Sequence, residues 1–254
     1  MTPEIFIDHV ALTVRDLPGM STFYEMALGL RLMGKDGAVR QLGTGDQVLV
    51  ELRADPAAAV RDPRQAGLFH MALLLPSRGD LGRWLRHSAS LGLRLAGASD
   101  HGVSEALYLG DPEGNGIEIY CDRPANQWVR QGDRIEMITA PLDLDDLARA
   151  GEGPWQGAPA ETIMGHVHLQ VGELAASDAF MSGQLGLTRT FDGPGGAWYG
   201  WNGYHHHLAG NIWNSRNAGP RDPRMAGLAE VVLRGTGGAG KVLTDPWGTR
   251  FRLS

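Results

Sequence analysis

The most informative residues of this chain are three potential metal ligands, His9, His70 and Glu118, each within a strand-like run. Glu118 stands in the apolar run 116–120, where a buried carboxylate is costly without a partner. A metal ion is one such partner. Two histidines and one carboxylate from separate strands form the ligand set of a non-haem Fe(II) facial triad. The sequence therefore predicts a metal site at His9, His70 and Glu118.

Alternation along the strands predicts how these side chains point. Because successive side chains of an extended strand face opposite sides, His9 lies opposite the apolar residues of its run IDHVALTV. The same alternation places His70 in LFHMALLL and Glu118 in GIEIY on the face away from the predicted helices. If the sheet curves, that face is concave, and the three side chains can converge.

The elements that carry these residues repeat along the chain. Apolar runs beginning near residues 7, 68 and 164 are each followed by a helical pattern that ends at a Leu-Gly-Leu. The glycines there, Gly29, Gly92 and Gly186, are the expected helix stops. Turn-rich strands follow each helix, so the unit is β-α-β-β-β, which marks a repeat architecture. A fourth copy begins near residue 228, but its stretch 234–243 is too short and glycine-rich for the helix.

These repeats predict an α+β protein in which tandem β-α-β-β-β modules form two curved mixed sheets, with a truncated fourth module. We expect residues 1–123 to form an N-terminal paired half that holds the metal site. Residues 161–254 would form a degenerate C-terminal half, and residues 124–160 would link the two. Within this linker, residues 142–150 could form a short helix capped by Asp143.

The composition limits the classes of protein to which the chain can belong. A net charge of −6 and a pI of about 5.8 give no basic surface for nucleic acid. One cysteine, Cys121, rules out an internal disulfide and fits a reducing, cytoplasmic setting. No apolar run approaches the roughly 20 residues of a membrane span, so no membrane partner is expected. The N-terminus enters a strand pattern at once, so no signal peptide is expected.

Paired β-α-β-β-β modules with these histidines and this glutamate resemble the vicinal oxygen chelate superfamily. That superfamily includes glyoxalase I, extradiol ring-cleaving dioxygenases and antibiotic-resistance proteins. The resemblance extends over roughly residues 5–254 and is closest to catechol 2,3-dioxygenase-type extradiol enzymes. It rests on the segments LFHMALLLPSRGDLGRWL, ASDHGVSEALYLGDPEGNGIEIY, MGHVHLQV and GYHHHLAGNIWNSR.

The resemblance implies an extradiol dioxygenase that uses Fe(II) to insert O2 into a small aromatic diol of the catechol type. Mn(II) shares the same ligands. It places the metal at His9, His70 and Glu118, a second-sphere histidine at His101 and an active-site tyrosine at Tyr108. Those enzymes usually carry another active-site histidine shortly before the second ligand, whereas residues 55–68 contain none. Either another group supplies that role or the chemistry differs.

The larger extradiol enzymes hold their metal in the C-terminal half, and here the matching positions differ. His166 stands at the first ligand position, Glu230 matches His70, and Arg252 matches Glu118. An arginine cannot ligate a cation, so the metal is expected in the N-terminal half. The remaining histidines could form a second metal site, a hydrogen-bonded network or a vestigial cavity; they are His166, His168, His205, His206 and His207.

Two other functions stay open at this point. One is another metal-dependent lyase, isomerase or transferase of the glyoxalase type, which usually has a fourth protein ligand; Glu51 could supply it. The other is a metal-free resistance protein that binds a small aromatic molecule. The missing fourth helix would leave a sheet face uncovered, and a second copy of the chain could cover it in a homodimer.

Overall fold

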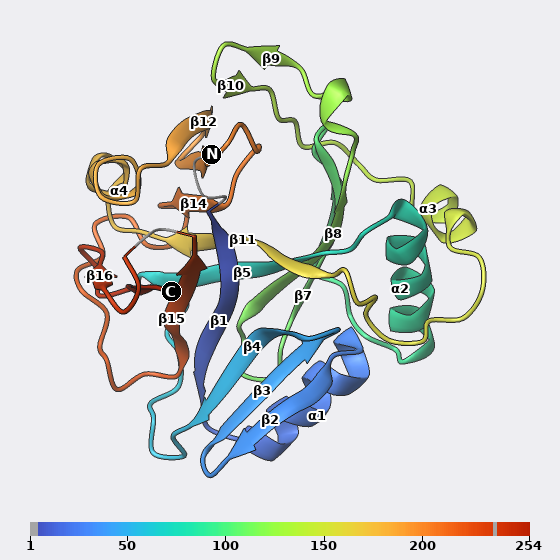
Figure 1. The fold of residues 1–254 in the computed structure, drawn as a ribbon, viewed down its shortest axis with the longest axis horizontal. Coiled ribbons are helices and arrows are strands. Elements are labelled where there is room, and N and C mark those ends of the chain that lie inside the picture. The colour runs from blue at the N-terminus through green and yellow to red at the C-terminus, as the bar shows by residue number, and fades with distance from the viewer. Residues whose placement is uncertain (1–4, 236–237) are drawn as a thin grey trace.

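The computed structural model describes residues 5–235 and 238–254 (Figure 1). Residues 1–4 of the expected N-terminal half, and 236–237 of the glycine-rich stretch, lie outside the described residues. The expected repeat is present as four modules. Module 1 consists of β1 (Phe6–Val14), α1 (Leu17–Leu28), β2 (Arg31–Asp36), β3 (Val39–Thr44) and β4 (Gln47–Ala54). Module 2 consists of β5 (Gly67–Leu74), α2 (Arg78–Ser90), β6 (Gly97–Asp100), β7 (Ser104–Gly110) and β8 (Gly116–Asp122).

A linker with short elements separates the first two modules from the last two. It contains η1 (Ala125–Gln127), β9 (Arg130–Gln131), β10 (Arg134–Ile135) and α3 (Leu144–Ala150). Module 3 consists of β11 (Ile163–Gln170), α4 (Leu174–Met181), β12 (Thr188–Gly193), β13 (Gly196–Gly200) and β14 (Leu208–Asn211). Module 4 consists of β15 (Gly227–Arg234), β16 (Val242–Thr244) and β17 (Arg250–Leu253), and its described residues contain no helix.

The local signals in the sequence explain where helices begin and end. Asp16 caps α1 by accepting a hydrogen bond from the Gly19 N–H at 3.0 Å, and Gly29 ends the helix with a φ of 71°. The predicted linker helix is also present, because Asp143 accepts a hydrogen bond from the Asp146 N–H at 2.9 Å at the start of α3. The α+β prediction with two mixed sheets is confirmed.

The modules pair in an order that the sequence did not suggest. The seven-stranded sheet has the order β16-β17-β15-β1-β4-β3-β2, and the eight-stranded sheet has the order β12-β13-β14-β11-β5-β8-β7-β6. Module 1 therefore joins module 4, and module 2 joins module 3. In Figure 1 the blue β1 lies beside the red β15, and the cyan β5 lies beside the yellow β11. The expected boundaries 1–123, 124–160 and 161–254 stay a prediction, but the halves do not consist of successive modules.

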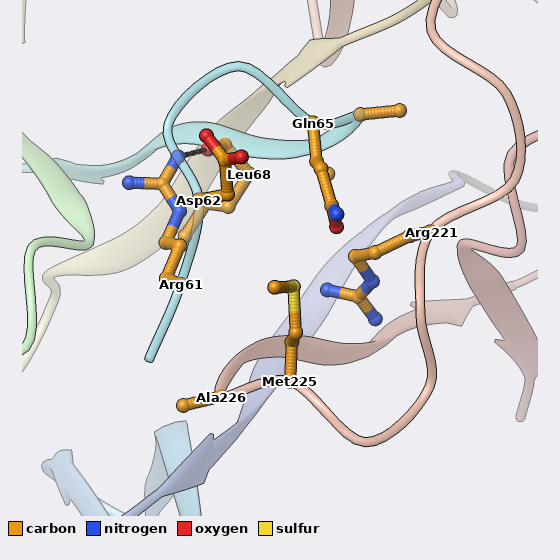
Figure 2. A pocket seen from close by; sticks show the side chains of 9 residues that line it. Arg61, Asp62, Gln65, Leu68, Arg221, Met225 and Ala226 are labelled. Atoms are coloured by element: carbon orange, nitrogen blue, oxygen red, sulfur yellow. Dashed lines mark hydrogen bonds between the residues drawn. The ribbon is translucent and has the colours of Figure 1, made fainter. Parts of the chain in front are cut away.

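The chain crosses between the sheets twice, each time through the motif Arg-Asp-Pro-Arg-x-Ala-Gly-Leu at 61–68 and 221–228. In each copy the first arginine donates a hydrogen bond to a carbonyl seven residues later, Arg61 to Leu68 and Arg221 to Leu228. Figure 2 shows both arginines beside one small pocket near the starts of β5 and β15. The two crossings are therefore fixed by the same side-chain contact.

The sheet face that the truncated module was expected to leave open is covered. Phe251 on β17 is fully buried, and its ring lies 5.3 Å from that of Phe180 on α4. The uncovered face was the reason to expect a homodimer, and that reason no longer holds. The homodimer itself stays a prediction. No helix in the described part of the chain is long and apolar enough to cross a membrane.

Candidate metal centre and substrate cavity

Three side chains of the eight-stranded sheet converge on one point. They are His70 on β5, Glu118 on β8 and His166 on β11, and their ligand atoms lie within 4.8 Å of one another. Both His70 Nε2 and His166 Nε2 approach Glu118 Oε2, at 3.0 and 3.1 Å. All three residues are buried, with exposed fractions of 7%, 2% and 2% in chain order.

Strand register explains this convergence. Ala72 on β5 is paired with Glu118 across the parallel neighbour β8 and with His166 across the antiparallel neighbour β11. His70 lies two residues before Ala72, so its side chain shares the same face. The small side chain of Ala72 leaves space between its two large neighbours. The ligand cluster is therefore a consequence of three adjacent strands and one small residue.

His9 does not belong to this cluster, which corrects the predicted triad. It lies on β1 in the seven-stranded sheet, where its Nδ1 is 2.8 Å from Asp8 Oδ2. The cavity beside His9 has different lining residues from the cavity beside His70. The prediction failed because it paired module 2 with module 1, whereas β5 pairs with β11 of module 3. His166 takes the place assigned to His9.

The cluster has the chemistry of a metal site. Among the described residues, the buried His166 Nδ1 has no hydrogen-bond partner. Burial acts to raise the pKa of the Glu118 carboxyl, but the contacts of this carboxyl with His166 and His70 hold that pKa well below its usual range. Burial lowers the pKa of His166. An ionised carboxylate beside the neutral ring of His166 is a protonation state in which both groups can bind a divalent cation.

The three residues lie in the wall of a cavity of about 540 Å³. This volume lies within the usual range for small-molecule sites, about 300–1,000 Å³. Both residues predicted to act beside the metal, His101 and Tyr108, line it. Most of the remaining wall is apolar, and it includes Phe69, Met137, Ile138, Phe191, Pro194, Trp198 and Trp213. The two tryptophans, Trp198 and Trp213, add large aromatic faces to this wall.

A hydrogen-bonded pair orients Tyr108. His101 Nδ1 lies 2.8 Å from the carbonyl oxygen of Ile138, which can only accept, so Nδ1 carries the proton. In the neutral ring Nε2 is then the acceptor for the Tyr108 hydroxyl, 2.8 Å away. Burial and the charge of Glu118 raise the pKa of Tyr108 well above its usual value. The tyrosine therefore keeps its proton and points it at His101.

The C-terminal histidines divide between this site and its surroundings. His166, His168 and His206 line the cavity. The ring of His206 lies 4.1 Å from that of His166. Burial lowers the pKa of His168 and His206 well below the usual range, so both rings are neutral. A second metal site, one of the three alternatives for these histidines, would not be separate, because His166 belongs to the cluster with His70 and Glu118. His166 and His70 occupy equivalent positions in the first strands of their modules, and this equivalence was the sequence signal that could have placed His166 in the cluster.

The position that could supply a fourth ligand is occupied by an alanine. By the register that places Glu118 opposite Ala72, the matching residue of module 3 is the one opposite His168, which is Ala209 on β14. Glu51, the fourth ligand considered from the sequence, lies on β4 in the other sheet. Its carboxylate accepts hydrogen bonds from Arg53 at 2.7 Å and Gln41 at 2.9 Å. The cluster therefore offers three candidate protein ligands.

The seven-stranded sheet contains a matching row in which arginines lie against the carboxylates. Ala11 on β1 is paired with Glu51 and with Glu230, as Ala72 is with Glu118 and His166. Glu230 accepts a hydrogen bond from Arg252 Nε at 2.7 Å and lies 3.5 Å from an Arg53 nitrogen. The two carboxylates are thus neutralised by guanidinium groups.

Comparison with known proteins agrees with this geometry. The sequence model of the Glyoxalase/Bleomycin resistance protein/Dioxygenase superfamily matches residues 6–119. Catechol-2,3-dioxygenase of Bacillus subtilis (strain 168) is 38% identical over 232 residues, which are 89% of this chain and 81% of that protein. This chain belongs to that superfamily. The resemblance read from the sequence is confirmed.

Two further comparisons show the range of the superfamily. Biphenyl-2,3-diol 1,2-dioxygenase 3 of Rhodococcus globerulus is 30% identical over 125 residues, which are 48% of this chain and 66% of that protein. The crystal structure of glyoxalase I from Zea mays has a TM-score of 0.59 at 17% identity, covering 98% of this chain and 92% of that one. The second likeness shows a shared fold.

Proposed function

We propose that this protein is an extradiol dioxygenase that cleaves the ring of a catechol-type aromatic with O2. The observation that carries the proposal is the buried cluster of two histidines and one glutamate in the wall of a largely apolar cavity. Two relatives, a catechol-2,3-dioxygenase and a biphenyl-2,3-diol 1,2-dioxygenase, support it.

His70, Glu118 and His166 would hold the metal, which we propose to be Fe(II), with Mn(II) as the alternative that shares these ligands. Held by these three residues, the metal would supply open positions for the substrate and O2 and would lower the pKa of a substrate hydroxyl. The absence of a fourth protein ligand at Ala209 favours this chemistry over that of the glyoxalase type. Three convergent buried ligands also argue against a metal-free binding protein.

The other cavity residues would bind and orient the substrate. Tyr108, held by His101, would place a hydroxyl beside the ligand cluster and hydrogen-bond a substrate oxygen. His206, a neutral ring beside His166, is a candidate for the second active-site histidine that residues 55–68 lack. The apolar wall would hold the aromatic ring and exclude water.

The test is anaerobic loading with Fe(II), followed by catechol and O2, with ring-opened product and O2 uptake as readouts. We expect activity in the wild type and a loss of at least about 100-fold in His166→Ala, because one of three ligands is removed. Metal content after gel filtration gives a second readout and should fall with the activity.

His9→Ala is the matched control, since His9 is the histidine that the sequence placed at the metal. It should bind iron and turn over catechol as the wild type does. Loss of iron from the His9 variant but not from the His166 variant would contradict the proposed ligand set. Bound iron without O2 uptake on several catechols would contradict the proposed reaction.

A further inference from the structure

A chain of hydrogen bonds leads from the cavity to an acidic residue at its rear. His205 Nδ1 lies 2.7 Å from His206 Nδ1, and His205 Nε2 lies 2.9 Å from Asp122 Oδ1. The Tyr204 hydroxyl donates to the other oxygen of Asp122 at 2.9 Å. His205 is fully buried, whereas His206 lines the cavity.

These contacts determine which nitrogens carry protons. An ionised carboxylate can only accept, so the His205 nitrogen that faces Asp122, Nε2, is the protonated one. In the neutral His205 ring, Nδ1 is then an acceptor. The partner nitrogen, His206 Nδ1, must therefore donate, and this leaves His206 Nε2 without a proton.

We propose that Asp122 and His205 are positioning residues that fix the tautomer of His206, so that its unprotonated Nε2 faces the cavity. The His206 ring is held from behind through Nδ1 and packs against the ring of His166. Its second nitrogen is thereby presented as a hydrogen-bond acceptor beside the ligand cluster. Neither His205 nor Asp122 touches the cavity in this arrangement, so both act through His206.

The ligand that this acceptor recognises is a hydroxyl group, and that part of the inference rests on the proposed function. A catechol held at the cluster presents O–H groups, and His206 Nε2 can accept a hydrogen bond from one of them. Tyr108 complements it, because its proton is directed at His101 and its hydroxyl oxygen can accept a second hydrogen bond. The cavity would then offer two acceptors to the two O–H groups of a diol.

The tautomer can be measured directly by NMR on the full-length protein with 15N-labelled histidine, both as purified and loaded with diamagnetic Zn(II). Protonated and unprotonated ring nitrogens have well-separated 15N shifts, and the signals of His206 are those lost in His206→Gln. We expect a protonated Nδ1 and an unprotonated Nε2. A proton on Nε2 in the wild type, which is the pattern a charged His205 would impose, overturns the proposal.

Two variants test the cause of the tautomer. His205→Phe keeps a flat ring but removes the acceptor, so the Nε2-protonated form of His206 should become populated. With catechol, kcat should fall about 10- to 100-fold, the range for residues that orient an active group, and KM should change little. Tyr204→Phe is the matched control: it removes a hydroxyl from Asp122 but leaves the Asp122–His205 contact, and the tautomer should not change.

An unchanged His206 tautomer in His205→Phe overturns the positioning role. If the wild-type tautomer is as expected but no catechol is turned over, the proposed function fails while the assignment of the two positioning residues stands. If catechol is turned over equally by wild type and His205→Phe, the dioxygenase proposal stands and the positioning role fails. The two failures are therefore distinguishable.

Discussion

The smallest residue of the site has a large effect on it. Ala72 separates Glu118 from His166 across three strands, and any larger side chain there would occupy the space that the ligands share. Ala11 has the same place between Glu51 and Glu230 in the other sheet. The two alanines therefore form a natural pair for substitution.

Ala72→Val should weaken metal binding about tenfold or more, because the added methyl groups push the ligands apart. The cost of overpacking should also reduce the free energy of unfolding by about 1–3 kcal/mol. Ala11→Val should carry a similar stability cost and leave metal affinity unchanged. Metal titration and denaturant unfolding of both variants measure this, and equal metal affinity in the two would refute the role of Ala72.

Cys121 gives a second prediction for a single residue. Burial raises the pKa of its thiol to about 12, with the charge of Glu105 as a further cause. Because the thiolate is the reactive form, the folded protein should resist iodoacetamide at pH 8 and react fully once unfolded in denaturant. Mass spectrometry counts the added groups. Rapid labelling of the native protein would show that the thiol is accessible.

At the scale of elements, the seven-stranded sheet contains a buried carboxylate whose negative charge is neutralised by arginine side chains. Glu230 is buried on β15, and burial acts to raise its pKa, but the hydrogen bond and charge of Arg252 lower it overall. Arg252→Leu should cost about 2 kcal/mol near pH 7, because a charged hydrogen bond to a buried group is lost. Arg250→Leu is the control, since that guanidinium is 3.6 Å away and more exposed, and it should cost less than about 0.5 kcal/mol.

The pH dependence of this difference follows from the lowered pKa. A carboxyl with a folded pKa below its unfolded value stabilises fully above the unfolded value and loses that contribution as the pH falls through the folded pKa. The stability gap between wild type and Arg252→Leu should therefore be full at pH 7 and shrink as the pH falls below the ordinary value of 4.5. Urea unfolding at several pH values measures it, and a gap that widens on acidification would contradict it.

Elements also show what the sequence could predict. Helix stops, the Asp143 cap and the β-α-β-β-β units follow from local patterns. One module contains His70, Glu118, His101 and Tyr108, and the structure brings these four predicted residues to one cavity. The error at His9 had a different origin. Which first strand lies beside β5 depends on the packing of whole modules, and β1 and β11 both offer a histidine at the matching position. Local pattern cannot decide between them.

At the scale of the whole molecule, the pairing order joins the ends of the chain. Val10 on β1 is paired with Val231 on β15, while the strands of modules 2 and 3, which lie between them in the sequence, form the eight-stranded sheet. Modules 2 and 3 therefore contain the cluster. Modules 1 and 4, which precede and follow them in the sequence, pair with each other.

Native-state hydrogen exchange should reveal this order. Amides of β1 and β15 should open together as denaturant rises, and those of β5 and β11 should open together, because cooperative units follow packed partners. Grouping of β1 with β5 instead, as consecutive modules would require, would contradict the pairing. Exchange followed by mass spectrometry of peptides from each strand is sufficient to decide.

The arginines of the seven-stranded sheet also imply that the two sheets differ in how their stability depends on the supply of metal ions. Their positive charges are covalently attached and cannot dissociate, whereas the cation proposed for the other sheet is exchangeable. A chelator should therefore loosen β5, β8 and β11 and leave β1, β4 and β15 as firm as before. If the proposed iron were scarce, the protein would lose the proposed activity and the rigidity of the eight-stranded sheet. The seven-stranded sheet would stay folded, so the protein could bind iron again without refolding completely.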